Sequence, residues 1–77
     1  MSDFEAIEQQ IAWLENESFV NPIKMAELRN TMTRLLAVAR AHQLNVDMYN
    51  ETGGCVAASE LASNSRKALT ELKEGGG

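Results

Sequence analysis

The sequence has few of the residues that cross-link a chain or carry catalysis, with one cysteine, one histidine and one proline among its 77 residues. Cys55 has no second cysteine with which to form a disulfide within the chain. Cys55 and His42 are also too few side chains for a structural zinc site. We therefore expect no metal site and no cofactor.

The sequence also lacks a long apolar run and an excess of basic residues. No stretch approaches the roughly 18 consecutive apolar residues of a membrane-spanning helix, and the first residues are acidic, unlike those of a signal peptide. The chain has 7 Lys and Arg against 11 Asp and Glu, and this net charge of −4 argues against a general nucleic-acid-binding protein. These absences predict a cytoplasmic protein that has no membrane partner.

The chain is short for a self-sufficient hydrophobic core. A domain of this size buries only about 60% of the surface that its unfolded chain exposes. Without a disulfide or a metal, the remaining source of stability is association. We expect a homodimer or higher oligomer, or a complex with another helical protein. The sequence predicts one domain over residues 1–74, followed by a disordered glycine tail at residues 75–77.

Apolar residues with helical spacing predict an all-α fold. Ser2 and Glu5 form a capping box that starts the first segment. Asn21 is a good N-cap for the second segment, and Pro22 suits its first helical position. Because the link between these two segments is short, we expect an antiparallel helical hairpin. The predicted helices are residues 3–17, 22–44 and 55–74.

The remaining parts of the chain complete a predicted three-helix, coiled-coil-like bundle. Phe19 and Val20 are apolar for a loop and are expected to plug the end of the hairpin. Residues 45–54 contain turn-forming residues between apolar ones, and are either a structured loop or frayed helix. The third helix is expected to pack across the hairpin or to swap onto a second copy of the chain.

The predicted helices carry apolar seams, which are stripes of apolar residues spaced by three and four positions. Such a stripe is most often core, but this chain has more of it than two helices need. We therefore interpret the seams as the interaction surface of the oligomer. The seam residues are Phe4, Ile7, Ile11, Leu14, Met25, Leu28, Met32, Leu35, Leu61, Leu69 and Leu72.

Charge is divided unevenly along the chain. Residues 1–20 sum to −5, residues 21–44 to +3 and residues 45–77 to −2. Opposite charges beside facing seams select orientation and partner, although a surface pair contributes only about 0–1 kcal/mol. We expect the first two segments to pair in this way, within one chain or between chains. The residues expected to form these pairs are Glu8 and Glu15 with Lys24 and Arg29.

Cys55 and His42 are the two residues with the most reactive side chains. Cys55 follows a glycine pair and precedes a predicted helix, whose N-terminus would favour a thiolate. A pair between Cys55 and His42 is conceivable. The simpler interpretation is that Cys55 packs as a small residue, and that His42 lies at the rim of a seam near a helix C-terminus. We predict no catalytic residue and no enzymatic activity.

The sequence therefore predicts a small non-enzymatic interaction protein that self-associates, such as an adaptor, a small chaperone or an accessory factor of a bacterium or its phage. An alternative is a dimeric nucleic-acid-binding regulator that uses the basic second helix. Against that alternative, Arg29 and Arg40 share a helix face, but Arg34 points about 140° away from Arg29. A weaker possibility is a thiol-dependent role for Cys55.

Overall fold

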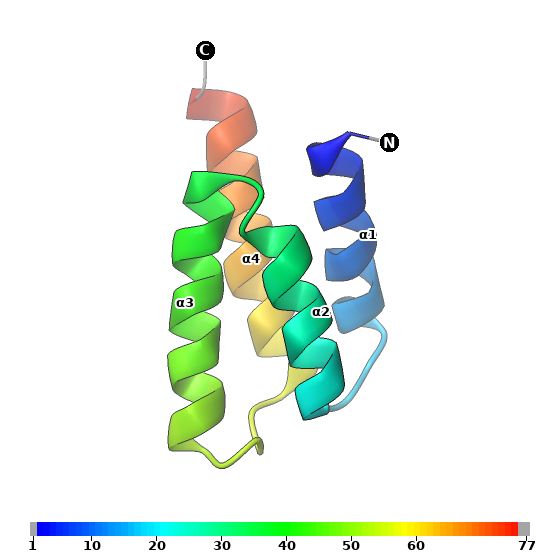
Figure 1. Ribbon diagram of the computed structural model, residues 1–77. Coiled ribbons are helices and arrows are strands. Elements are labelled where there is room, and N and C mark those ends of the chain that lie inside the picture. The colour runs from blue at the N-terminus through cyan, green and yellow to red at the C-terminus, as the bar shows by residue number, and fades with distance from the viewer. Residues whose placement is uncertain (1, 76–77) are drawn as a thin grey trace.

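The computed structural model describes residues 2–75, which form four α-helices. These are α1 (Asp3–Glu15), α2 (Pro22–Met32), α3 (Leu36–Glu51) and α4 (Ala58–Gly75). The helices run alternately down and up, so that every chain neighbour is antiparallel (Figure 1). Both α1 and α3 pack against α2 and α4, which closes the helices into a bundle. The all-α prediction is confirmed, but the prediction of three helices is wrong.

The predicted second helix is interrupted by a turn that reverses the chain. The α2 helix ends at Met32, and α3 begins at Leu36. The Thr33 hydroxyl donates a hydrogen bond to the Arg29 carbonyl at 2.6 Å, and Leu35 adopts an extended conformation with φ −119° and ψ 127°. Neither glycine nor proline marks this turn, and the apolar spacing continues through it, so the periodicity alone predicts one long helix.

Tertiary packing explains why the chain reverses there. An unbroken helix over residues 22–44 would be about 34 Å long, against about 20 Å for the 13 residues of α1. The excess would project beyond the first helix. Reversal instead places α3 between α2 and α4, where Val38, His42 and Asn45 become buried.

The segment at residues 45–54, which the sequence left as loop or helix, is mostly helix. The α3 helix continues to Glu51, and a short link then leads to Ala58 at the start of α4. Gly53 and Gly54 have φ values of 64° and 87°, which glycine adopts without the steric cost of a side chain. The predicted tail at residues 75–77 is only partly described: Gly75 ends α4, and residues 76–77 lie outside the described part.

The capping signals of the first two helices are confirmed. The Ser2 hydroxyl oxygen accepts a hydrogen bond from the Glu5 backbone N–H at 3.2 Å. The Asn21 side-chain oxygen accepts one from the Lys24 backbone N–H at 2.7 Å, and Pro22 is the first residue of α2. These bonds satisfy N–H groups that the first turn of a helix leaves without partners.

The core is assembled from all of these helices and from two of the links. The link between α1 and α2 and the link between α3 and α4 lie at the lower end in Figure 1. There the Ala58 N–H donates a hydrogen bond to the Ser18 carbonyl at 2.9 Å. Val20 closes this end as expected, whereas Phe19 is 63% exposed and does not plug it. The buried apolar residues are Ile7, Ile11, Leu14, Val20, Met25, Leu28, Met32, Val38, Val56, Ala58, Leu61, Ala62 and Leu69.

A buried polar network joins α3 to α4. Asn45 is 2% exposed, and its side-chain N–H₂ lies 3.2 Å from both the Leu61 carbonyl and the Ser65 hydroxyl oxygen. Its side-chain oxygen accepts a hydrogen bond from Asn64 at 2.9 Å. Because buried polar groups are costly when unpaired, this network favours one register of α3 against α4.

Candidate functional site

The predicted interaction seams form the interior of a single chain. Eight of the seam residues are buried, and Phe4 and Leu35 pack against the same core, while Leu72 is partly exposed. In this fold the seams are therefore closed to a partner, and a binding surface must be sought among other residues. The buried seam residues are Ile7, Ile11, Leu14, Met25, Leu28, Met32, Leu61 and Leu69.

Glu8 and Glu15 of α1 pair with α4 within the chain, and not with Lys24 and Arg29 of the second segment as expected. The Glu15 carboxylate lies 2.8 Å from the Arg66 guanidinium, and Glu8 pairs with Lys73. The hydrogen bond and positive charge of Lys73 hold the pKa of the Glu8 carboxyl below its ordinary value of 4.5. Glu8 and Glu15 are about two helical turns apart, so they share the side of α1 that packs on α4.

The basic residues of the second segment are dispersed by the turn between α2 and α3. Lys24 pairs with Glu27 of its own helix at 3.1 Å, and its ammonium lies 4.3 Å from the centre of the Trp13 ring. Arg34, in the turn, lies 3.8 Å from the Asp3 carboxylate. Arg29 stays on α2 and Arg40 falls on α3. There is therefore no single basic helix of the kind that the nucleic-acid alternative invoked.

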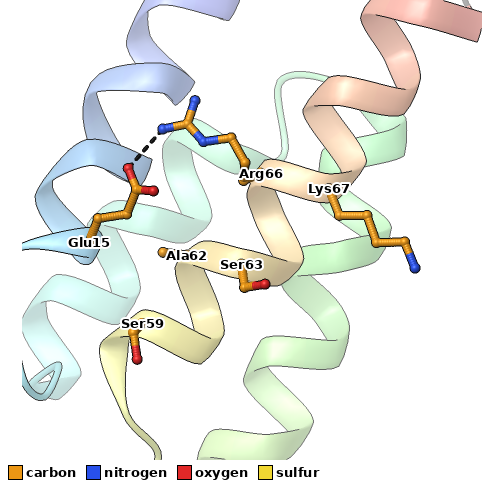
Figure 2. Close-up of a pocket in the computed structure, with 6 residues that line it drawn as sticks. All are labelled: Glu15, Ser59, Ala62, Ser63, Arg66 and Lys67. Carbon is orange, nitrogen blue, oxygen red and sulfur yellow. Dashed lines mark hydrogen bonds and ion pairs between the residues drawn. The ribbon is translucent and has the colours of Figure 1, made fainter.

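A hollow of about 520 Å³ lies between α1 and α4 (Figure 2). The Glu15–Arg66 ion pair joins the two helices there, and Lys67 points away from Glu15. The serines in its lining, Ser59 and Ser63, have no histidine or cysteine beside them in the hollow.

An apolar surface lies across α3 and α4. Leu36 and Leu44 are 70% and 62% exposed, although Leu36 would be expected to join the apolar face of a continuous second helix. Hollows of about 280 and 310 Å³ lie side by side there and share Ala37, Ala68 and Glu71. We call this surface the α3–α4 face. The hollows are lined by Ala37, Arg40, Ala41, Leu44, Asn64, Lys67, Ala68, Glu71, Leu72 and Gly75, and Leu36 is exposed one turn before Arg40 on α3.

The opposite flank of α3 faces a hollow that we call the α2–α3 cleft. It has a volume of about 360 Å³ and is lined by Arg29, Thr33, Ala39, His42, Gln43 and Val46. His42 is 4% exposed in the middle of α3, so the prediction of a rim residue near a helix C-terminus is wrong. Its Nε2 is buried without a hydrogen-bond partner among the described residues. Burial and the nearby Arg29 guanidinium lower the pKa of the His42 imidazole from its ordinary 6.5.

This buried histidine is expected to make the fold sensitive to mild acid. In the unfolded chain the imidazole takes up a proton near its ordinary pKa of 6.5, whereas the native state resists protonation. The stability that neutral His42 provides is complete above that value. It falls by at most about 1.4 kcal/mol per pH unit as the pH drops toward the lowered native pKa.

Urea denaturation at several pH values between about 7 and 5 measures this effect. This range spans the ordinary histidine pKa, which is lowered for His42 in the native state. The His42→Gln variant cannot titrate at this position and serves as the control. Its free energy of unfolding should change less with pH than that of the unsubstituted protein. Identical pH profiles for the two proteins would contradict a neutral, buried His42.

Cys55 neither packs in the core nor lies beside His42. It is exposed, so it is not a packing residue, and the neighbouring Val56 enters the core instead. The α4 helix begins at Ala58, later than predicted, and Cys55 is absent from both hollows that His42 lines. The structure thus brings no base to the thiol from that histidine.

Among residues 2–75, no group of three or more His, Cys, Asp or Glu side chains is placed to hold a metal ion. None of the helices in this range combines the length and the apolar character needed to cross a membrane.

The structure defines this chain as a small antiparallel helical bundle with an exposed apolar face on one flank of α3 and a polar cleft on the other. No protein-family model matches the chain, and comparisons with curated proteins and with solved structures also found no match. Leu44 is not among the predicted seam residues, because in a continuous second helix it would lie about 180° from the seam residue Leu35.

Proposed function

We propose that the protein is a non-enzymatic helical interaction module that self-associates through the α3–α4 face. The observation that carries this proposal is the exposure of Leu36 and Leu44 on one helix, at 70% and 62%. Scattered exposed leucines are ordinary, but these two flank Arg40 at intervals of four residues, and Leu44 lines a hollow together with Ala37, Ala41 and Ala68. Burying this surface against a partner would remove apolar area from water.

The charges on the α3–α4 face favour a second copy of the same chain as the partner. Arg40 comes from α3 and Glu71 from α4, and both line the same hollow. Neither takes part in an ion pair within residues 2–75. In a two-fold symmetric dimer one patch meets itself, so Arg40 of each copy can face Glu71 of the other. Lys67 lines the same hollow, so the face carries two cations and one anion, and the Arg40–Glu71 contact is the one in which opposite charges can meet between copies.

Sedimentation equilibrium from low micromolar to millimolar concentration tests this proposal. The average mass should rise from the 8.5 kDa of one chain toward twice that value. The Leu44→Glu variant should stay monomeric, because it places a charge in the apolar centre of the interface. Ile23→Glu is the matched control: Ile23 is 79% exposed on α2, away from the face, and its replacement should leave association unchanged.

Charge reversal provides a second test of the same interface. Arg40→Glu and Glu71→Arg should each weaken self-association, whereas an equal mixture of the two variants should form a heterodimer. Such a pattern identifies a specific cross-chain contact. The proposal would be refuted if the average mass stayed at that of one chain up to millimolar concentration. It would also be refuted if Leu44→Glu left the average mass unchanged.

A further inference from the structure

The α2–α3 cleft has the size and the mixed lining of a small-molecule site. Its volume of about 360 Å³ lies within the range of about 300–1,000 Å³ that is usual for ligand pockets. A second hollow of about 240 Å³ adjoins it, because both are lined by Arg29, His42 and Val46. The combined groove follows the α2–α3 contact from the Thr33 end toward Pro22.

Arg29 and His42, which line both hollows, are without partners of their own. Arg29 takes part in no ion pair in the described part of the chain, although it is a permanent cation. His42 is only 4% exposed, and no group within residues 2–75 pairs with its Nε2. Leaving a buried polar group unpaired costs free energy, which a suitable ligand would recover.

The other polar side chains of the cleft are already engaged. The Thr33 hydroxyl donates to the Arg29 carbonyl at 2.6 Å, and the Gln43 amide donates to the Asp47 carboxylate at 3.2 Å. The groups that remain for a ligand are thus a guanidinium and an imidazole. Both are donors in the presence of an anion, and a guanidinium fits the two oxygens of a carboxylate.

The adjoining hollow supplies apolar contacts. Met25, Val46 and Tyr49 line it beside Pro22 and Ala26. Met25 is buried, and Val46 and Tyr49 are partly buried against the core, so these walls are supported from behind. A ligand that reaches from Arg29 into this hollow would need an anionic end and an apolar body.

We propose that the α2–α3 cleft binds a small organic carboxylate, with its carboxylate between Arg29 and His42 and its apolar chain in the hollow lined by Met25, Val46 and Tyr49. The carboxylate gives the exposed Arg29 guanidinium an anion, and a side-chain movement on binding that uncovers the buried His42 Nε2 gives the imidazole N–H an acceptor. This site is independent of self-association, because the cleft and the α3–α4 face have no residue in common.

Titration of the isotopically labelled protein with hexanoate, followed by backbone amide NMR, tests the site. Amide shifts should concentrate around Arg29, His42 and Val46. Acetate should bind more weakly, by about fourfold for each methylene group that hexanoate buries. Hexanamide has the same chain without the charge and should cause much smaller shifts. Equal responses to hexanoate and hexanamide, or shifts scattered over the surface, would overturn the proposal.

Substitutions distinguish binding of the carboxylate in the cleft from a general attraction of anions to positive charge on the protein. Arg29→Gln should weaken hexanoate binding by about tenfold, the loss expected for one charge-assisted pair. Arg40→Gln is the matched control, since Arg40 also lacks an ion pair among the described residues but lies outside the cleft. His42→Gln should also weaken binding. Equal losses in Arg29→Gln and Arg40→Gln would refute the site, whatever the protein's oligomeric state.

Discussion

Replacing Ile11 with alanine is expected to lower the free energy of unfolding by about 2–5 kcal/mol. Ile11 is fully buried in the core between α1 and its neighbours, and truncation leaves a cavity that the surrounding side chains fill only in part. A protein of 77 residues has a total stability of about 4–12 kcal/mol. This one change should therefore remove a large share of it, as urea denaturation followed by circular dichroism will measure.

Ile23→Ala is the matched control for this prediction. It is the same substitution on a helix, but Ile23 is 79% exposed where Ile11 is fully buried. Its effect should stay within about 0.5 kcal/mol, as for most surface substitutions. Similar losses for the two variants would mean that α1 does not supply the core in the way that the structure shows.

Replacing Asn45 with alanine is expected to cost about 2–3 kcal/mol. The change removes the hydrogen bonds from its side chain to the Leu61 carbonyl and Ser65, and it leaves the Asn64 amide with only the Met48 sulfur as an acceptor. Ser65 is fully buried and cannot turn to water instead. Denaturation with urea should show a lower midpoint with little change in slope.

A double-mutant cycle with Ser65→Ala tests whether the network, and not the lost volume, causes the effect. Asn45 and Ser65 should be coupled by at least about 0.5 kcal/mol, since each single change removes their shared bond. Asn50→Ala, at an exposed position of the same helix, should be nearly neutral. Additive losses at Asn45 and Ser65 would show that the α3–α4 register is held by apolar packing alone.

The α3 helix has a different chemical role on each of its flanks. Asn45 and Val38 face the interior, Leu36 and Leu44 lie on the proposed self-association face, and His42 lines the proposed carboxylate site. The two proposed sites are on one rigid element but share no residue, so their tests can fail separately. This arrangement follows from packing α3 between α2 and α4.

Local features of the sequence were sufficient to predict where the first two helices start and which side of each is apolar. The capping bonds at Ser2 and Asn21 form as the residue types require, because a cap depends only on neighbours three residues away. The seam residues Ile7, Ile11 and Leu28 are buried because helical spacing places them on one side.

The charge pattern was not sufficient to predict its pairing. Acidic α1 and the basic second segment are adjacent in sequence, yet Glu8 and Glu15 pair with Lys73 and Arg66 of α4. A helix has several neighbours in a bundle, and only their positions decide which charges meet. Exposed ion pairs are too weak to impose that arrangement against the packing of the core.

The sequence by itself determined an all-helical chain, the first two helix starts and most of the core residues, because these depend on local hydrogen bonds and helical period. Only the tertiary structure decided that the chain reverses after Met32, since the spacing continues across the turn without glycine or proline. That reversal buries His42 and Asn45 and leaves Leu36 exposed. After the reversal, α3 contacts both α2 and α4. The end of one straight helix would project beyond its neighbours and could not make these contacts.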